Sequence, residues 1–463
     1  MPPDHLTAEE AMAHFTCRTK AALIAKSISP EQPDILADLF TSYRASFRAA
    51  SEKIAGRTVI EFHQLPNLER SGGRYMIDAL STFVEFGQIT RLDAISSDLA
   101  PRTIRYATIF FYPFNPLPRW HTAILHFAAA AIEIATGLAP ASGYVCFGRA
   151  PTIKAVRPGR YLKHMEVIKE IVLAHRVQQP PPLELNSHCP ICQFRTRCRN
   201  KAIEADNLSL VSSIPPKERR KLEAKGITTV TQLSYTYGPK RKRRAHATPR
   251  PAYTLMTNKN DNGLKALAIR KNQVHIINVE PVSSLGTPVY FDVEGIPDAD
   301  QYYLVGLRFR RRAKWLEYTF WADTRAGERQ IWQQFLTTLG AVSNPQLIHY
   351  GSYESVYLAR MRGRYPETIR NKRQFNALLQ QSRNLLKNIY ASIYFPTFTN
   401  GLKDIAAYLG FTWSDPTLNG SLASLLRMQW EIEPREGKKQ RLIQYNMDDC
   451  RATQIVADAI DRF

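Results

Sequence analysis

The fold of this chain is decided around residues 289–295, which read Val-Tyr-Phe-Asp-Val-Glu-Gly. The run is apolar, β-branched and aromatic, so it predicts a buried strand. Asp292 and Glu294 stand two positions apart, and the alternation of a strand places both side chains on one face of the sheet. Two buried anions so close together repel each other. Either both carboxylates face water from an edge strand, or a divalent cation binds between them.

The length and net charge of the chain limit the number of domains and the kinds of partner that we expect. With 463 residues the chain exceeds one ordinary domain, so we expect two or three domains. A formal net charge of +21 favours polyanionic partners, nucleic acid first, although a merely solvated basic surface is the alternative. No apolar run reaches the length of a bilayer span and the first residues show no signal pattern. We therefore expect no membrane partner and a cytoplasmic location.

A cysteine cluster lies near the end of the first expected domain, an α/β unit over residues 1–205. Cys189, Cys192 and Cys198 follow a Cys-x2-Cys-x5-Cys pattern. Three thiols so close together, in a chain that is expected to be reduced, indicate a metal site. An iron–sulfur cluster of the 4Fe–4S type is expected, with zinc as the alternative.

The cluster needs a fourth ligand from elsewhere in the chain. We place Cys17 there, in the middle of a helix expected over residues 6–26, with Cys146 and His188 as alternatives. A site built in this way would be structural, because it would clip the two ends of the domain together.

This arrangement of cysteines, strands and helix resembles RecB-type nucleases that carry an iron–sulfur cluster, among them CRISPR-associated exonucleases. The resemblance implies a PD-(D/E)XK-like fold, with a catalytic Asp on one strand and Glu-x-Lys on the next. Asp93 is the candidate for the Asp, with Asp78 as the alternative, but the following strand, residues 106–113, contains neither Glu nor Lys. We therefore expect a degenerate nuclease domain that is kept for binding or support.

Residues 206–285 are expected to form a helical connector. A helix opened by proline, a Lys225-Gly226 turn and a helix capped by Thr are similar to a helix-hairpin-helix module, whose turn amides can hold a DNA phosphate. An ordinary helical linker is the alternative. Residues 266–270 and 273–279 indicate a pair of strands. Two runs of cations are expected to bind phosphates, at Lys240, Arg241, Lys242, Arg243 and Arg244 and, further on, at Arg310, Arg311, Arg312 and Lys314.

The third expected domain, residues 286–463, begins with three strands in a row. A helix follows near Glu328, then a buried strand and another helix. This order resembles a ribonuclease-H-like α/β fold. The four expected strands cover residues 289–293, 302–310, 315–321 and 346–350.

The last helix adds a further carboxylate. We expect it to open at Tyr445, and Asp449 stands three and seven residues before the apolar Ala452 and Val456. That spacing directs Asp449 from the helix face that packs on the sheet. An Asp that only stabilises the helix dipole is the alternative interpretation.

The carboxylates together resemble the DEDD family of 3′–5′ exonucleases. Asp292 and Glu294 match the first motif of that family, and Tyr445 with Asp449 matches the third. In the second motif Glu354 stands in place of the Asp, which keeps a carboxylate but moves it by one methylene. Gly295 occupies a position where many relatives carry Thr.

The whole domain order resembles a family of RecB-like nucleases with a fused exonuclease domain. The resemblance implies hydrolysis of DNA, or less readily of RNA, from a 3′ end, with two Mg²⁺ or Mn²⁺ ions. Two other functions stay open: an inactive nucleic-acid-binding scaffold and an iron–sulfur regulator that responds to redox state. The expected metal ligands are Asp292, Glu294, Glu354 and Asp449, and Tyr445 would orient the attacking water.

Overall fold

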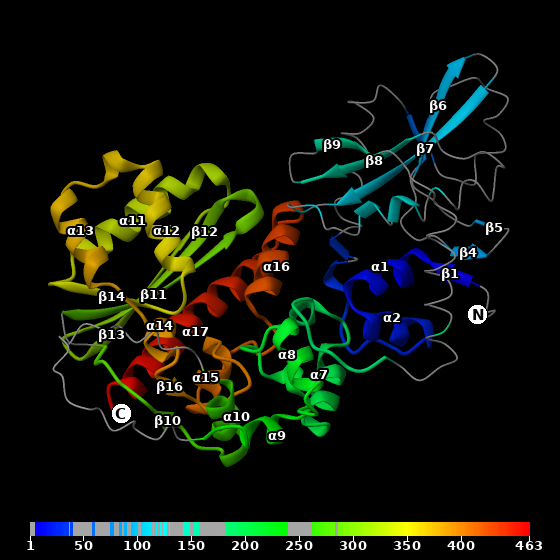
Figure 1. Cartoon of the computed structure of the whole chain (residues 1–463). Coiled ribbons are helices and arrows are strands. Elements are labelled where there is room, and N and C mark those ends of the chain that lie inside the picture. Colours follow the sequence, from blue (N-terminus) through cyan, green and yellow to red (C-terminus); the bar gives the residue numbers. More distant parts are fainter. Residues whose placement is uncertain are drawn as a thin grey trace, which may run out of the picture. The chain divides into compact units, whose positions relative to one another are not determined.

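The computed structural model describes residues 5–36, 38–39, short stretches between 58 and 174, and residues 181–238, 261–282 and 286–463. It divides into two compact units, Met1–Cys198 and Arg199–Phe463 (Figure 1). The boundary falls inside helix α7 (Arg195–Glu204). Within the described residues, no helix is both long enough and apolar enough to span a membrane.

The first unit contains a six-stranded sheet with the order β2-β3-β6-β7-β8-β9. Strands β7 and β8 are parallel, as are β2 and β3, and the other neighbours are antiparallel. A smaller sheet has the order β1-β4-β5. These strands are β1 (His5–Thr7), β2 (Thr58–Ile60), β3 (Tyr75–Ile77), β4 (Phe83–Glu85), β5 (Gln88–Ile89), β6 (Ala94–Ala100), β7 (Thr103–Tyr112), β8 (Ser142–Phe147) and β9 (Thr152–Val156).

The single helix expected over residues 6–26 is instead two helices, α1 (Ala8–Thr16) and α2 (Arg18–Ala25). They meet at Cys17, whose backbone is extended, with φ −161° and ψ 113°. The Cys17 sulfur accepts a hydrogen bond from the Lys20 amide at 3.5 Å and so caps α2. Cys17 therefore lies at a helix terminus rather than in a helix interior.

The connector is helical where the structure describes it. It contains α8 (Pro216–Glu223), α9 (Val230–Ser234) and α10 (Asn262–Lys271). The prediction of a strand at residues 266–270 is therefore wrong. Asp261 caps the start of α10 by accepting the Leu264 amide at 3.0 Å, and Asn272 ends it in the left-handed conformation. These caps favour the helix over the local β-propensity that indicated a strand.

The C-terminal domain is built on a five-stranded sheet with the order β13-β12-β11-β14-β15. The first three strands are antiparallel, whereas β14 and β15 run parallel to β11. The four strands predicted from the sequence are present in the predicted chain order, and β15 is a fifth strand that was not predicted. The strands are β11 (Thr287–Ile296), β12 (Gln301–Arg311), β13 (Lys314–Trp321), β14 (Pro345–His349) and β15 (Arg383–Asn384).

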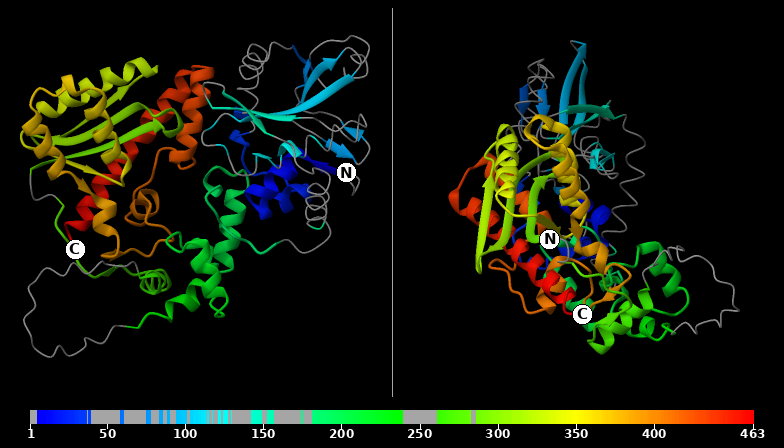
Figure 2. Two further views of the ribbon diagram at one scale, coloured as in Figure 1. Left: turned by 45° about the horizontal axis from the view of Figure 1, so that its top comes forward. Right: turned by 90° about the vertical axis from the view of Figure 1, so that its left-hand side faces the viewer.

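Helices cover both faces of this sheet (Figures 1 and 2). Val289, Phe291 and Val293 pack with side chains of α11 (Glu328–Gly340), α12 (Tyr353–Arg364) and α13 (Lys372–Gln381) in one apolar core. The opposite face carries α17 (Glu436–Ile460), the long red helix of Figure 1. Helix α17 begins at Glu436, well before the expected start at Tyr445. Further helices are α14 (Leu385–Ile389), α15 (Leu402–Tyr408) and α16 (Gly420–Ile432).

Candidate functional site

Three carboxylates from two elements converge between the sheet and α17. Asp292 and Glu294 project from β11 on the face opposite the apolar core, as the alternation of the strand requires. Asp449 projects from α17 toward them. One carboxylate oxygen from each residue lies within 4.8 Å of the others. Glu294 is 7% and Asp449 9% exposed, so the group is largely shielded from water.

Burial and mutual repulsion make these carboxylates hard to ionise. Burial raises the pKa of Asp292 and of Glu294 well above the ordinary range, and the charge of Asp449 adds to the rise in both. Burial also raises the pKa of Asp449, to about 7. A divalent cation would relieve this repulsion, and carboxylate oxygens are ligands that Mg²⁺ and Mn²⁺ prefer. The donor set therefore fits such an ion.

A β-bulge shapes the strand at this point. The register of β11 with β12 shifts between Glu294 and Gly295, and such bulges re-aim neighbouring side chains. A Cβ on Gly295 would lie 2.3 Å from the Tyr353 hydroxyl and 2.6 Å from the Gln301 carbonyl oxygen. The glycine is thus required because Tyr353 occupies the space that a larger side chain would fill.

A second glycine allows α17 to approach the sheet. Gly306 on β12 pairs with Asp292, and a Cβ there would lie 2.2 Å from the Asn446 side-chain oxygen and 3.0 Å from the Cys450 sulfur. Asn446 is fully buried and donates from Nδ2 to Asp292 Oδ2 at 2.5 Å. Close packing of helix on strand therefore holds Asp292 in place.

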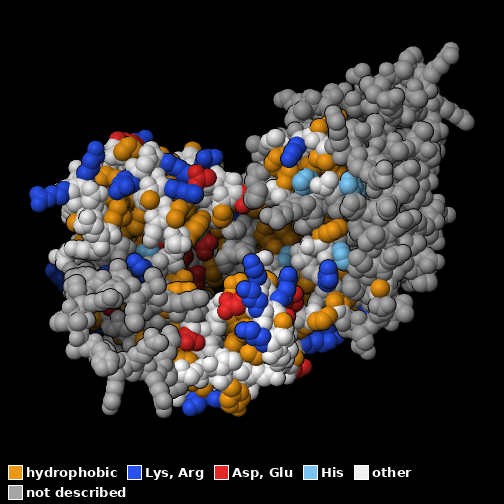
Figure 3. Space-filling view, in the orientation of Figure 1, with side chains coloured by type: hydrophobic (Ala, Val, Ile, Leu, Met, Phe, Trp, Pro, Cys, Tyr) orange, Lys and Arg blue, Asp and Glu red, His pale blue; other side chains and the backbone are white. Residues whose placement is uncertain are grey.

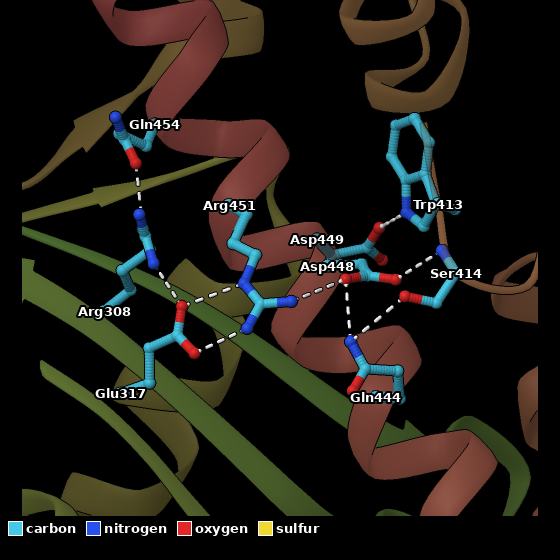
Figure 4. Close-up of polar contacts among 9 residues, drawn as sticks. All are labelled: Arg308, Glu317, Trp413, Ser414, Gln444, Asp448, Asp449, Arg451 and Gln454. Carbon is cyan, nitrogen blue, oxygen red and sulfur yellow. Dashed lines mark hydrogen bonds and ion pairs between the residues drawn. The ribbon is translucent and has the colours of Figure 1, made fainter. Parts of the chain in front are cut away.

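Asp449 is held from two sides. The Trp413 indole donates to Asp449 Oδ1 at 2.7 Å (Figure 4), and the Tyr445 hydroxyl is hydrogen-bonded to the same carboxylate. Burial, together with the charges of Asp449 and Glu294, raises the pKa of Tyr445 far above its usual range. Tyr445 is therefore a neutral hydroxyl beside the carboxylates and not a base.

Glu354, the fourth expected ligand, lies nearby but apart from the other three. Its side chain on α12 is buried, and its Oε2 lies 3.4 Å from His349 Nδ1. Its charge contributes to the raised pKa of Asp292 and of Glu294. Among the described residues, however, the group within 4.8 Å contains only Asp292, Glu294 and Asp449. The longer side chain thus faces His349 and does not complete a tight set of four.

Some residues of the site were not predicted from the sequence. They are Asn446, Asp448, Trp413 and Gly306. Asn446 could have been found, because it shares the sheet-facing side of α17 with Asp449 and stands three residues before it. Trp413 lies in a segment without periodicity, 36 positions before Asp449, and offers no comparable signal.

Four cysteines in the first unit face one cavity. Cys17, Cys189, Cys192 and Cys198 line it together with His188 and Lys20. Burial raises the pKa of Cys198 to about 12, and the other three thiols add to the rise. Among the described residues, no three of these sulfurs lie within 4.8 Å of one another. The side chain of Cys146 lies outside the described residues.

The two helices predicted on either side of the Lys225-Gly226 turn, α8 and α9, are present, but the backbone amides of the turn already have acceptors. The amides of Lys225, Gly226 and Ile227 bond to carbonyl oxygens of α8. Those of Thr228 and Thr229 share the side-chain oxygen of Gln232. A phosphate would therefore have to displace existing hydrogen bonds, so these amides are not a ready-made phosphate site.

Of the two predicted cationic segments, one lies among the described residues. Residues 240–244, like Asp78 and Asp93, lie outside the described residues. Arg310, Arg311, Arg312 and Lys314 are exposed at the β12–β13 hairpin, whose turn residues Arg312 and Ala313 have φ of 47° and 67°. Elsewhere on the C-terminal unit, Lys and Arg side chains are spread over the face shown in Figure 3.

A comparison with protein families agrees with this geometry. Residues 289–460 match the model of the RNase_H superfamily. No curated protein matches the chain. The match begins in β11 and ends with α17, so the C-terminal part of the chain is ribonuclease-H-like. Such domains are usually nucleases that use divalent metals. The RecB-like resemblance of residues 1–205 stays a prediction.

Proposed function

We propose that the C-terminal domain is a metal-dependent nuclease that removes nucleotides from the 3′ end of single-stranded or frayed DNA, in DNA repair or processing. The observation that carries this proposal is the group formed by Asp292, Glu294 and Asp449, whose ligand atoms lie within 4.8 Å in a largely buried place. Carboxylates in such a place favour a bound cation, and a ribonuclease-H-like fold supplies the context.

The side chains around the group would divide the work. Asp292, Glu294 and Asp449 would hold Mg²⁺ or Mn²⁺, with Glu354 as the fourth ligand if it turns from His349. When bound, two such ions activate a water and stabilise the leaving 3′-oxygen. Tyr445 stays protonated, and its oxygen can accept a hydrogen bond from that water and orient it.

The exposed cations would bring the substrate to this site. Arg310, Arg311, Arg312 and Lys314 form a compact positive hairpin, and the chain carries a net charge of +21. Phosphate contacts of this kind give binding that weakens steeply with salt. We include residues 240–244 in the same role, prefer DNA to RNA, and propose a cytoplasmic location.

The first unit would support the nuclease through a 4Fe–4S cluster held by Cys17, Cys189, Cys192 and Cys198. All four thiols line one cavity. A single zinc ion held by the same sulfurs is the alternative. Strand β7 has neither Glu nor Lys, which supports a structural role for this domain.

A non-hydrolytic scaffold remains the second candidate, favoured by one observation. Glu354 faces His349 at 3.4 Å and is absent from the tight carboxylate group. If it cannot turn, the second ion has fewer ligands and the domain would bind nucleic acid without cleaving it. An iron–sulfur regulator that responds to redox state is the other alternative.

Incubation of the purified chain with single strands separates these functions. The strands carry a label at the 5′ end, and half of them carry phosphorothioate linkages at the 3′ end. The nuclease predicts stepwise shortening with Mn²⁺ that EDTA, Asp292→Ala and the phosphorothioates each stop. Tight binding without shortening would support the scaffold. Cleavage that survives Asp292→Ala would contradict the proposed site.

A further inference from the structure

Asp448, the neighbour of Asp449, is not part of the carboxylate group. The residue is 2% exposed, and its side chain accepts three hydrogen bonds (Figure 4). The donors are the Ser414 amide at 2.8 Å, Gln444 Nε2 at 3.0 Å and Arg451 Nη1 at 3.1 Å. Consecutive helical residues differ by about 100° in direction, so Asp448 reaches the segment that passes beside the helix. Asp448 is therefore a buried, hydrogen-bonded side chain and not an exposed charge next to Asp449.

That segment, residues 411–419, connects α15 to α16 and carries Trp413. Ser414 is bonded to Asp448, while the adjacent Trp413 donates its indole N–H to Asp449. Two successive residues of the segment are thus bonded to two successive carboxylates of α17. The position of one contact therefore constrains the other.

Other contacts fasten the same segment. Arg441 of α17 binds Asp415 at 2.6 Å. Lys403 of α15 donates to the carbonyl oxygen of Pro416 at 3.1 Å and to that of Leu418. These contacts bind the later part of the segment. Ser414, the residue next to Trp413, is bound through its amide by Asp448 and through its hydroxyl by Gln444, whose Nε2 donates to it at 3.2 Å.

A row of charged side chains of alternating sign leads from the sheet to Asp448 and orients its partner Arg451 (Figure 4). Arg451 binds Glu317 with two nitrogens, at 2.9 and 2.6 Å. Glu317 also binds Arg308, which donates to Gln454 at 2.8 Å. The row runs from β12 and β13 to α17, so the sheet orients Arg451 toward Asp448.

We propose that Asp448 is a positioning residue, which locks residues 411–419 onto α17 so that Trp413 donates to Asp449 and fixes its direction for ion binding. The inference rests on the proposed function, because it assigns Asp449 an ion. Groups that orient a ligand typically change metal affinity or activity 10–100-fold when they are removed. Asp448 would reach that effect through Trp413 and without touching the ion.

The test is a double-mutant cycle with Asp448→Asn and Trp413→Phe, which removes the indole donor. Mn²⁺ affinity is measured by titration of the metal-free chain, together with the kcat and KM of strand shortening. Each single variant is expected to weaken Mn²⁺ binding and to lower kcat about tenfold, with KM unchanged. The double variant is expected to lose about tenfold and not a hundredfold, since both changes break one path. Asp458→Asn is the matched control, a carboxylate on the same helix bonded to Gln454.

Two results would overturn the inference: wild-type Mn²⁺ affinity in Asp448→Asn, or effects that multiply in the double variant. If Asp448→Asn fails to fold, Arg451→Gln replaces it in the test. This substitution removes one hydrogen-bond donor to Asp448, and the Arg451 side chain that it changes is 35% exposed. It should then weaken Mn²⁺ binding measurably, and an unchanged affinity would again contradict the inference. A wild-type chain that binds Mn²⁺ but cuts no strand refutes the proposed function, whereas the Mn²⁺ cycle still decides the role of Asp448.

Discussion

Replacing Asp449 by Asn should stabilise the metal-free protein at alkaline pH. Burial first, and the charge of Asp448 with it, raise the pKa of Asp449 and make its charged form costly. Asn has the same shape and keeps an oxygen that can accept the Trp413 indole, which lies 2.7 Å from Asp449 Oδ1. The substitution therefore removes a repelled charge and leaves the hydrogen bond from Trp413 intact.

The size of the effect follows from the pKa of Asp449, which is raised from 3.8 to about 7. A group whose folded pKa lies above its unfolded value contributes stability below the unfolded pKa, and that stability is lost as pH rises through the folded pKa. Each pKa unit corresponds to about 1.4 kcal/mol, so the ceiling is about 4 kcal/mol. Because three carboxylates share the repulsion, we expect a gain of about 1–4 kcal/mol at pH 8 and almost none at pH 4.

Thermal unfolding in EDTA at both values of pH measures this gain, with Asp458→Asn as the control. For a domain of this size, about 2–4 °C is expected per kcal/mol. Excess Mn²⁺ should reverse the order, because it stabilises the wild type and not the variant. An Asp449→Asn protein that is no more stable than wild type at pH 8, or equally stabilised at both values of pH, would refute the reasoning.

Three further substitutions test other parts of the account. Gly306→Ala places a Cβ 2.2 Å from the Asn446 side-chain oxygen, so unfolding should become easier by about 1–3 kcal/mol and cleavage should fall; an unchanged melting temperature would contradict this packing. Cys17→Ser should remove bound iron and the visible absorbance that accompanies it, and an equally coloured and stable variant would exclude Cys17 as a ligand. The buried Lys265 ammonium donates to Asn400 Oδ1 at 2.8 Å and to two other oxygens, and Lys265→Met removes all three hydrogen bonds. The free energy of unfolding in urea should fall by about 1–3 kcal/mol. Wild-type stability would show that these contacts contribute nothing.

The residue positions predicted best from the sequence were those set by patterns with a fixed period. A strand alternates every two residues, so Asp292 and Glu294 had to share a face, and helical spacing directed Asp449 toward the sheet. The succession of strands and helices along the C-terminal domain was also predicted, from three strands in a row followed by helices and a further strand. In the first unit, the spacing of Cys189, Cys192 and Cys198 predicted that these three thiols lie together, and they line one cavity.

The features of the site that the sequence did not predict depend on contacts between distant segments. Trp413 reaches Asp449 because residues 411–419 are fastened to α17, and nothing in their composition indicates that. The direction of Glu354 depends on His349, which the strand pattern presented only as a buried residue. Local propensity also misled, since residues 266–270 form a helix once Asp261 and Asn272 cap it.

The central claim is that Asp292, Glu294 and Asp449 form the metal site of a nuclease. Its most direct test is the rate at which mononucleotides leave a single DNA strand in Mn²⁺, compared between Asp292→Asn and Asp458→Asn, two conservative changes of one carboxylate each. Asp292→Asn should lose cleavage by a hundredfold or more, on the order expected when a group that binds the reaction's metal is removed, while Asp458→Asn keeps the wild-type rate. Equal rates in the two variants, or a wild-type chain that releases no nucleotide, would contradict it.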